Sequence, residues 1–160
     1  MKLSSIEEYG LRCLLQIARK GEGASLTIAE MSEREGISSP NVAKIMRLLR
    51  RAGLVRSTRG KAGGYSLTRK AAEVRALDVL VALGGRLFDT GFCDRHKGQA
   101  TSSCLNTRDC SIRPVLRGLQ DAVDQVLGEL TLASLLHSEG EVTVSLRPRA
   151  VKLPLVPRAG

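Results

Sequence analysis

The sequence predicts a mainly α-helical fold with one small β-hairpin, and three observations lead to this prediction. Two helix start signals follow each other closely at Thr27 and Ser39, with a glycine turn between them. A glycine-rich segment over residues 54–67 then has the composition of a β-hairpin. Beyond residue 110, an apolar pattern continues for the length of a helix of about five turns. The predicted fold is a winged helix-turn-helix unit with a long C-terminal helix that we expect to mediate dimerisation.

An amphipathic helix is expected from the first serines to about Lys20, because apolar residues recur there at helical spacing. Ser5 and Glu8 have the spacing of a capping box, and Ser4 with Glu7 is the alternative register. Cys13 lies on the apolar face of this helix and is expected to be a core residue.

The first helix of the helix-turn-helix is predicted to begin near Thr27, which has capping-box spacing to Glu30. Gly36 supplies the turn, because glycine adopts a positive φ without strain. The second helix is expected to start at Ser39 as its cap, with Pro40 in the first turn, where the missing N–H costs no helical bond.

The second helix is the candidate recognition helix. Its apolar positions share one face and are expected to pack in the core: Val42, Ile45, Met46 and Leu49. The opposite face then carries Asn41, Lys44, Arg47 and Arg51. Gly53 ends the helix, Leu54 and Val55 open the hairpin, and Gly60, Gly63 and Gly64 form its turn. Another helix is expected from Arg69 to Leu83, and Gly84 breaks it.

Charge indicates what this unit binds. Residues 44–70 contain no Asp or Glu, and they contain nine basic residues: Lys44, Arg47, Arg50, Arg51, Arg56, Arg59, Lys61, Arg69 and Lys70. Such an unmixed basic surface on a helix and a hairpin tip favours phosphate binding, with the helix in the major groove of double-stranded DNA and the hairpin in the minor groove. The aromatic content of 2% offers few stacking surfaces for unpaired bases, which disfavours single-stranded partners. The candidate DNA-contacting residues are Ser38, Ser39, Pro40, Asn41, Lys44, Arg47, Arg56, Arg59, Lys61 and Tyr65.

Charge, hydropathy and cysteine content limit the classes of protein to which this chain can belong. The 160 residues carry a net charge of +9, and no apolar run has the length of a membrane span, so a cytoplasmic protein is expected. Four cysteines in a reducing compartment favour thiol, metal or cluster chemistry over structural disulfides. The one pair resembling a nucleophile and base, Cys93 with His96, has no third group to orient it, so an enzyme is not expected.

The segment 84–110 has little periodicity, yet it contains three cysteines in the spacing C-x10-C-x5-C: Cys93, Cys104 and Cys110. Three thiolates in one loop suit an iron-sulfur cluster, which binds Cys and tolerates one N or O ligand. Zinc is the alternative, because His96 with these cysteines would complete a Cys3His site. A thiol switch without any metal is the third possibility.

The apolar stripe of residues 111–137 exceeds what the small winged unit can cover. We therefore expect it to pack against a second copy, giving a homodimer that matches a palindromic operator. Residues 138–160 contain three prolines and no apolar period, so a flexible tail is expected there. The predicted organisation is a DNA-binding domain (1–83), a cysteine-rich loop (84–110), a dimerisation helix (111–137) and the tail.

Taken together, the stretches KLSSIEEYGLRCLLQIA, IAEMSEREGIS and LLRRAGLVRSTRGKAGGYSLTR, with the three-cysteine loop and the long helix, resemble the IscR/NsrR-type family of bacterial winged-helix regulators over residues 1–137. This resemblance implies a homodimeric transcription factor, such as a repressor, whose iron-sulfur cluster (2Fe-2S or 4Fe-4S) senses redox state, nitric oxide or iron-sulfur status.

The resemblance also implies a ligand set. Relatives of the NsrR type complete the cluster with a carboxylate from the first helix of the other subunit, and that position matches Glu8. The remaining ligands would be Cys93, Cys104 and Cys110, with His96 and Asp94 as alternatives to Glu8. Arg113 stands where IscR-like members have a histidine.

Overall fold

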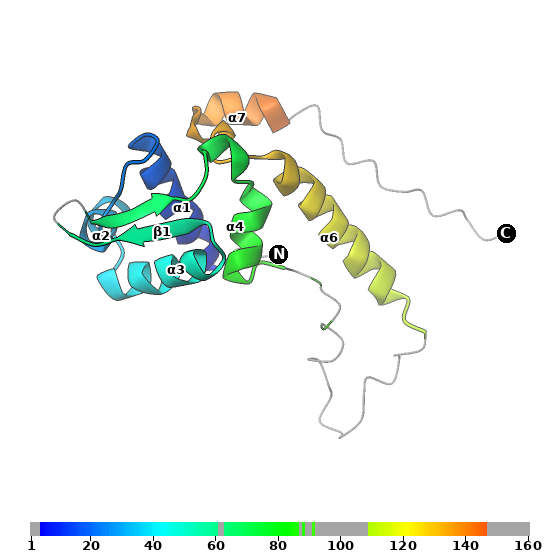
Figure 1. Cartoon of the computed structure of the whole chain (residues 1–160). Coiled ribbons are helices and arrows are strands. Elements are labelled where there is room, and N and C mark those ends of the chain that lie inside the picture. The colour runs from blue at the N-terminus through cyan, green and yellow to red at the C-terminus, as the bar shows by residue number, and fades with distance from the viewer. Residues whose placement is uncertain (1–3, 61–62, 87, 89–90, 92–108, 147–160) are drawn as a thin grey trace, which may run out of the picture.

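The computed structural model describes residues 4–60, 63–86, 88, 91 and 109–146 (Figure 1). Helices α1 (Ser5–Arg19), α2 (Ile28–Glu35) and α3 (Ser39–Arg51) come first, followed by the antiparallel hairpin of β1 (Val55–Thr58) and β2 (Gly64–Leu67). A first 3-10 turn (Ala71–Glu73) precedes α4 (Ala76–Leu83). After the cysteine-rich segment come α6 (Ile112–Glu129), a second 3-10 turn (Ser134–Leu136) and α7 (Glu139–Leu146). This order confirms the predicted winged helix-turn-helix.

Helix α1 is capped in the alternative register. The Glu7 N–H donates to Ser4 Oγ at 3.4 Å, and the Ser4 N–H donates to Glu7 Oε2 at 2.7 Å. The other register, with Ser5 and Glu8, was wrong, because Ser4 has the extended backbone of a cap and Ser5 already belongs to the helix. Glu8 is therefore not used for capping.

Helix α2 begins after Thr27, as predicted. The Glu30 N–H donates to Thr27 Oγ1 at 3.1 Å, and the Thr27 N–H donates to Glu30 Oε2 at 2.7 Å. Gly36 ends the helix with a φ of 65°. Helix α3 starts one residue earlier than expected: Ser38 is the cap, without a side-chain bond, and Pro40 is at the second helical position.

Replacing Thr27 with Ala should destabilise the winged unit by about 1 kcal/mol, because the first turn of α2 loses its cap. Urea denaturation at pH 7 measures the loss of stability in Thr27→Ala.

The bonds donated by the Thr27 N–H and hydroxyl, with one from Lys20, lower the pKa of Glu30 to about 2 from 4.5. A depressed carboxylate pKa stabilises the fold above the unfolded value and loses this effect as the pH falls from about 4.5 towards 2. The pH dependence is tested with Glu30→Gln, whose free energy of unfolding is compared with that of the wild type at pH 7 and at pH 3. An equal loss of stability at both pH values would contradict a stabilising role of the Glu30 carboxylate above its pKa.

The hairpin has the register Val55 opposite Leu67, Arg56 opposite Ser66 and Thr58 opposite Gly64. Leu26 extends it, since Leu26 and Tyr65 exchange backbone bonds of 3.0 and 2.8 Å. Gly64 is required here, because a Cβ at this residue would lie 2.6 Å from the Leu26 carbonyl oxygen. The wing is thus anchored to the chain that enters α2.

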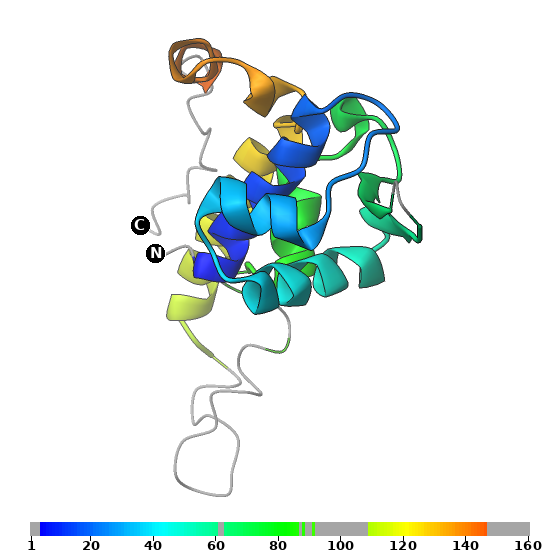
Figure 2. The ribbon, with the colours of Figure 1, turned by 90° about the vertical axis from the view of Figure 1, so that its left-hand side faces the viewer.

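The core lies between α1, α2, α3, α4 and the hairpin. Its side chains include all four predicted residues of α3, and Cys13 is fully buried as expected. Its buried members are Cys13, Leu14, Ile17, Leu26, Met31, Val42, Ile45, Met46, Leu49, Leu54, Val55, Val74, Val79 and Leu132. Figure 2 shows α3 along one edge of the molecule and α7 at the opposite end. The face of α3 away from the core is therefore open.

The predicted helix from Arg69 to Leu83 is interrupted. Val74 and Arg75 are extended, because this part of the chain pairs with the chain that leaves α6: the Ala76 N–H donates to the Leu130 carbonyl at 2.8 Å, and the Leu132 N–H donates to the Val74 carbonyl at 2.9 Å. Leu132 enters the core at this point. The start of α4 is thus fixed by residues more than fifty positions away.

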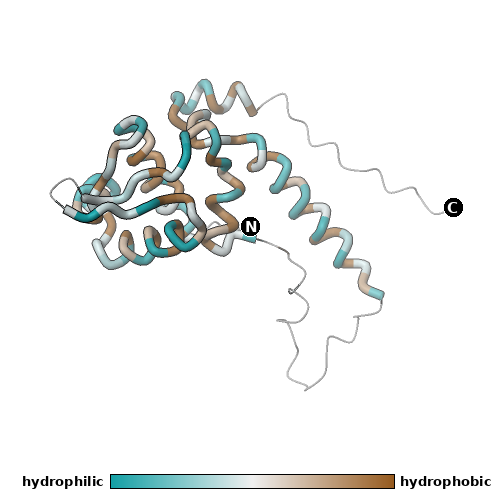
Figure 3. Tube along the Cα trace, in the orientation of Figure 1, coloured by the Kyte–Doolittle hydropathy of each residue, from teal (hydrophilic) through white to brown (hydrophobic). Residues whose placement is uncertain are grey.

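Helix α6 extends away from the winged unit and leans against α4 (Figure 1). Its inner face is held by Arg86, which lies 3.4 Å from Asp124, and by the buried Gln120, which accepts a 3.1 Å bond from the Phe88 N–H. Its outer face carries exposed apolar residues, and Figure 3 shows apolar positions recurring along the helix.

The region 138–160 differs from the predicted tail, because its first part forms α7. Ser138 and Glu141 make a capping box, with the Ser138 N–H donating to Glu141 Oε2 at 2.9 Å and the Glu141 N–H donating to Ser138 Oγ at 3.4 Å. This start signal is visible in the sequence and was missed. Residues 147–160 lie outside the described part. None of the described helices has the length and apolar content needed to cross a bilayer.

Candidate nucleic-acid interface

The outer face of α3 presents the predicted recognition surface. Ser38, Ser39, Pro40 and Asn41 are exposed at its N-terminal end, and Lys44 and Arg47 are exposed one and two turns further on. The opposite face is fixed in the core by Val42, Ile45, Met46 and Leu49, so the orientation of the exposed residues is determined by packing. This helix can be inserted into a groove without disturbing the fold.

The basic residues of this surface have no acidic partners nearby. Among the residues that the structure describes, no ion pair is formed by Lys44, Arg47, Arg50, Arg51, Arg56 or Arg59. Unpaired surface cations are available for phosphate oxygens and release counterions when they bind them. The electrostatic character predicted from the sequence is therefore retained in the fold.

The wing continues this surface. Arg59 is exposed immediately after β1, where Gly60 turns the chain with a φ of 105°. Arg50 Nη1 lies 3.4 Å from Ser57 Oγ and connects the last turn of α3 to the first strand of the wing. Sequence reasoning missed this contact, which depends on how the hairpin folds back. Lys61 lies outside the described residues.

Arg56 and Tyr65 have structural contacts as well. Arg56 is exposed, but its Nε donates a 3.1 Å bond to Ser66 Oγ across the hairpin. Tyr65 is half-buried, packs against the core and forms the bridge to Leu26. A DNA contact by either residue remains a prediction.

Glu8 lies on the surface of α1, and its side chain is 51% exposed. The Arg12 guanidinium donates a 2.7 Å bond to Glu8 and lies 3.8 Å from Glu35, a carboxylate that is only 7% exposed. Gln16 also donates a 2.6 Å bond to Glu35. Because Glu35 is the last residue of α2, Arg12 connects Glu8 to the helix-turn-helix. The spacing of four residues between Glu8 and Arg12 could have indicated the first contact, but not the second.

Of the three candidate cysteine ligands, the structure describes Cys110. It is half-buried, it is a free thiol, and it lies just before α6. Cys93, Cys104, His96 and Asp94 lie outside the described residues. Within the described part, no three His, Cys, Asp or Glu side chains come together as a metal site. The start of α1 is nevertheless close to the start of the cysteine segment, since a Cβ on Gly85 would lie 2.9 Å from Glu7 Oε1.

Residues 3–138 match the sequence model of the Rrf2 family, described as iron-dependent transcriptional regulators. The chain belongs to the Rrf2 family. It is 29% identical over 154 residues to the HTH-type transcriptional regulator IscR of Escherichia coli O1:K1, and the match covers 96% of this chain and 91% of IscR. The predicted resemblance to IscR-type regulators is therefore confirmed.

Solved structures give the same assignment. CymR (YrzC), the global cysteine regulator of B. subtilis, has a TM-score of 0.67 and 26% identity, over 85% of this chain and 96% of CymR. The oxidised form of Staphylococcus aureus CymR has a TM-score of 0.65 and 27% identity, over 86% of this chain and 98% of that one. This Rrf2 protein is thus a DNA-binding transcriptional regulator.

Proposed function

We propose that this Rrf2 regulator binds a palindromic operator as a homodimer, and that an iron-sulfur cluster held by Cys93, Cys104 and Cys110 of one subunit and by Glu8 of the partner subunit controls its affinity for DNA. The observation that carries the cluster proposal is the spacing of the three cysteines together with the position of Glu8. Glu7 performs the capping, so the half-exposed Glu8 carboxylate is available as a ligand. Cys110 supports the same site as a free thiol next to α6.

The donor chemistry of these residues fits an iron-sulfur cluster, because such clusters are held mainly by thiolates and tolerate one ligand of another kind, here a carboxylate. Such a cluster would supply a redox-active centre that is sensitive to oxidants. The competing contact of Glu8 is weak: its ion pair with Arg12 lies on the surface, where such pairs contribute about 0–1 kcal/mol. Glu8 can therefore exchange Arg12 for another partner at little cost.

Arg12 offers a physical connection from this site to the DNA-binding unit. When Glu8 is engaged elsewhere, the charge of Arg12 is balanced by Glu35 alone at the end of α2. Glu35 is nearly buried and also accepts the bond from Gln16, so its position influences how α2 sits on α1. A change in the bonding of Glu8 would thus alter the contacts that hold Glu35, the residue just before the turn that leads into α3.

The homodimer proposal is supported by the outer face of α6. Ile112, Val115 and Leu119 are 63%, 60% and 53% exposed, and they lie on one stripe of the helix. Exposed apolar stripes of this kind are usually covered by a partner. A second copy is the natural partner, because two-fold symmetry would place two α3 helices for two operator half-sites.

A thiol switch without a cluster is the second candidate. It is favoured by the similarity to CymR, whose structures include an oxidised form. Both candidates keep the DNA-binding role, and they differ in metal content. Protein purified without oxygen should be coloured and contain iron and acid-labile sulfide under the cluster proposal. Colourless protein without iron would leave the thiol switch, and stoichiometric zinc would indicate a zinc-stabilised repressor instead.

Arg59→Ala should weaken operator binding by roughly 1 to 3 kcal/mol, because the exposed guanidinium at the wing tip is placed to enter the minor groove. The loss should be greatest on operators with a narrow A/T-rich groove. Fluorescence anisotropy on an operator selected from random-sequence DNA measures this effect. Arg19→Ala, which removes an exposed arginine from the end of α1, is the matched control. Equal affinities of the two variants would mean that the wing does not contact the groove.

A further inference from the structure

The recognition helix α3 and the wing are joined by a short turn whose geometry is fixed by backbone bonds. At the end of α3 the Leu54 N–H donates to the Leu49 carbonyl at 3.0 Å. The Gly53 N–H donates to the Arg50 carbonyl, also at 3.0 Å. With Gly53 at a φ of 72°, these two bonds form the Schellman motif that commonly closes a helix. The peptide between Gly53 and Leu54 therefore has a fixed position relative to α3.

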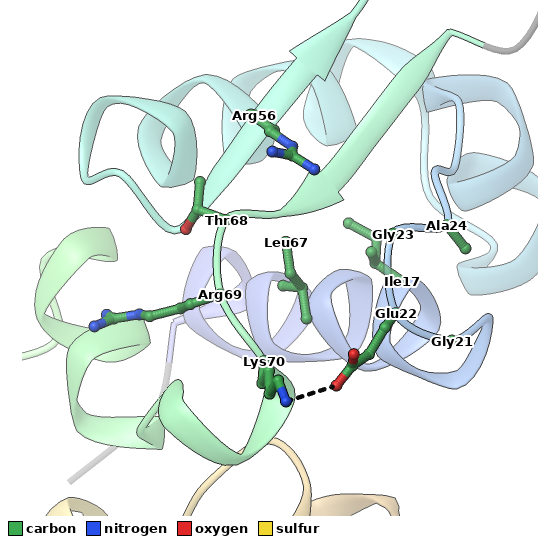
Figure 4. Close-up of a pocket in the computed structure, with 10 residues that line it drawn as sticks. All are labelled: Ile17, Gly21, Glu22, Gly23, Ala24, Arg56, Leu67, Thr68, Arg69 and Lys70. Carbon is green, nitrogen blue, oxygen red and sulfur yellow. Dashed lines mark ion pairs between the residues drawn. The ribbon is translucent and has the colours of Figure 1, made fainter.

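Thr68, the residue that follows β2, is bonded to this turn. Its backbone N–H donates to the Leu54 carbonyl at 3.2 Å. Its hydroxyl lies 2.6 Å from the Gly53 carbonyl oxygen and 3.2 Å from that of Leu54. A hydroxyl carries a single hydrogen, so the shorter contact with Gly53 is the main bond. Figure 4 shows the Thr68 hydroxyl oxygen beside the chain that joins α3 to β1. The chain that leaves the wing is thus attached to the end of the recognition helix.

Packing holds the Thr68 side chain only loosely. The residue is exposed, and it lies in the wall of a pocket of about 180 Å³ between the turn after α1 and the end of β2, which Arg56 also lines (Figure 4). The orientation of the Thr68 side chain therefore depends on its hydroxyl bond.

The other supports of the wing do not replace this bond. Only the first residue of β1, Val55, is buried, and the remaining three are exposed. Leu26 pairs with β2, but it belongs to the chain before α2 and not to α3. Arg50 of α3 reaches Ser57 of β1 at 3.4 Å, a long contact on the exposed surface. Among the described residues, the Thr68 hydroxyl makes the shortest side-chain bond between the end of α3 and the wing.

A small change of angle at this joint is large at the tip of the wing. Gly60 follows Val55 by five positions, so the tip lies about 17 Å from the root at the rise of an extended strand. A rotation of about 10° at the root then displaces the tip by roughly 3 Å, which is more than a hydrogen bond tolerates. Because the two grooves lie at fixed positions on a duplex, such a displacement would misplace the wing while α3 stays in the major groove.

We propose that Thr68 is the positioning residue that sets the angle between the recognition helix and the wing, and with it the spacing of their two contacts on DNA. This role rests on the proposed contact of the wing with the minor groove. The hydroxyl acts on DNA binding indirectly, through the place that it gives to Arg59. Loss of the hydroxyl leaves the buried Val55 and the Thr68 N–H bond in place, so it changes the angle of the wing without unfolding it.

The first test measures this angle in the full-length, DNA-free protein from residual dipolar couplings of the amides of α3, β1 and β2. Thr68→Val replaces the hydroxyl with a methyl group of nearly the same size. The hairpin couplings of this variant should fit a different orientation relative to α3, or fall in magnitude, while those within α3 stay unchanged. Thr68→Ser keeps the hydroxyl and should restore the wild-type couplings. Hairpin couplings of Thr68→Val that match the wild type would overturn the proposal.

The second test measures operator affinity. Thr68→Val should weaken binding about three- to tenfold, the range of one lost hydrogen bond, and Thr68→Ser should weaken it less than about twofold. In an Arg59→Ala background, Thr68→Val should have no further effect, because the contact that it misplaces is already absent. Thr143→Val is the matched control. It removes a hydroxyl that donates a 2.7 Å bond to the Glu139 carbonyl of α7, at the opposite end of the molecule from α3 (Figure 2).

Equal weakening by Thr68→Val in the wild-type and Arg59→Ala backgrounds would show that Thr68 does not act through the wing. A purely stabilising role would lower the urea midpoint but leave both the couplings and the affinity of the folded protein unchanged, and it would also overturn the proposal. If Arg59→Ala itself binds like the wild type, the proposed wing contact fails, and the dipolar couplings alone decide whether Thr68 sets the angle.

Discussion

Substituting Ser for Cys93, Cys104 or Cys110 is expected to give protein without iron or sulfide whose DNA affinity no longer responds to oxidants. A serine hydroxyl is not deprotonated at neutral pH and binds iron far more weakly than a thiolate, so one substitution removes a quarter of the proposed ligand set. The effect should be close to complete for each cysteine, because three remaining ligands are too few for the cluster. Iron and sulfide analysis of anaerobically purified variants, combined with operator binding before and after oxidation, measures both effects.

Cys13 is the internal control for this experiment. It is fully buried in the core, and burial, reinforced by the charge of Glu35, raises the pKa of its thiol to about 11. A thiol in this state is a poor nucleophile and a poor ligand at neutral pH. Cys13→Ala should keep the cluster and the oxidant response, and Ala is chosen because a Ser hydroxyl would need a partner in the core. Loss of the response in Cys13→Ala but not in Cys104→Ser would contradict the assignment.

Glu8→Gln separates the fourth ligand from the cysteines. The substitution keeps the size of the side chain and leaves the Ser4–Glu7 cap intact, so the fold should be unchanged. The cluster should then be present but lost faster on exposure to air, because a neutral amide oxygen is a weaker ligand than a carboxylate. A cluster as long-lived as that of the wild type would move the search to His96 and Asp94.

The elements that could be predicted from the sequence are those fixed by local chemistry. Thr27 with Glu30, Gly36, and the apolar face of α3 lie where they were expected, because capping, positive φ and helical periodicity act within a few residues. The choice between Ser4 and Ser5 as the cap of α1 could not be made locally, since both registers have the required spacing.

Features that depend on contacts between distant parts of the chain could not be predicted from the sequence. The break before α4 follows from pairing with residues 130–132, and the Arg12 contact with Glu35 requires α1 to lie against α2. The pocket at Arg56 forms only when the turn after α1 meets the end of β2. The basic surface was predictable because charge survives folding, whereas which arginine is held by Ser66 or Ser57 was not.

Val115→Glu on the outer face of α6 is expected to convert the protein to a monomer and to lower operator affinity by about 100-fold or more. In the proposed dimer, the stripe of Ile112, Val115 and Leu119 meets its own symmetry mate, so the variant would bury two carboxylates close together. Burying unpaired charge costs several kcal/mol, and roughly 3 kcal/mol already corresponds to more than 100-fold in affinity. A monomer also contacts only one half-site.

Val144 on α7 provides a matched control for this substitution, because it is 62% exposed, against 60% for Val115, and lies outside the stripe of α6. Val144→Glu should therefore remain dimeric with unchanged operator affinity. Light scattering coupled to size-exclusion chromatography gives the mass of each variant, and anisotropy on operators with one or two half-sites gives the affinity. On a single half-site, wild type and Val115→Glu should bind alike, because α3 and the wing are intact in both. A dimeric Val115→Glu variant with wild-type affinity for the full operator would show that α6 does not form the dimer interface.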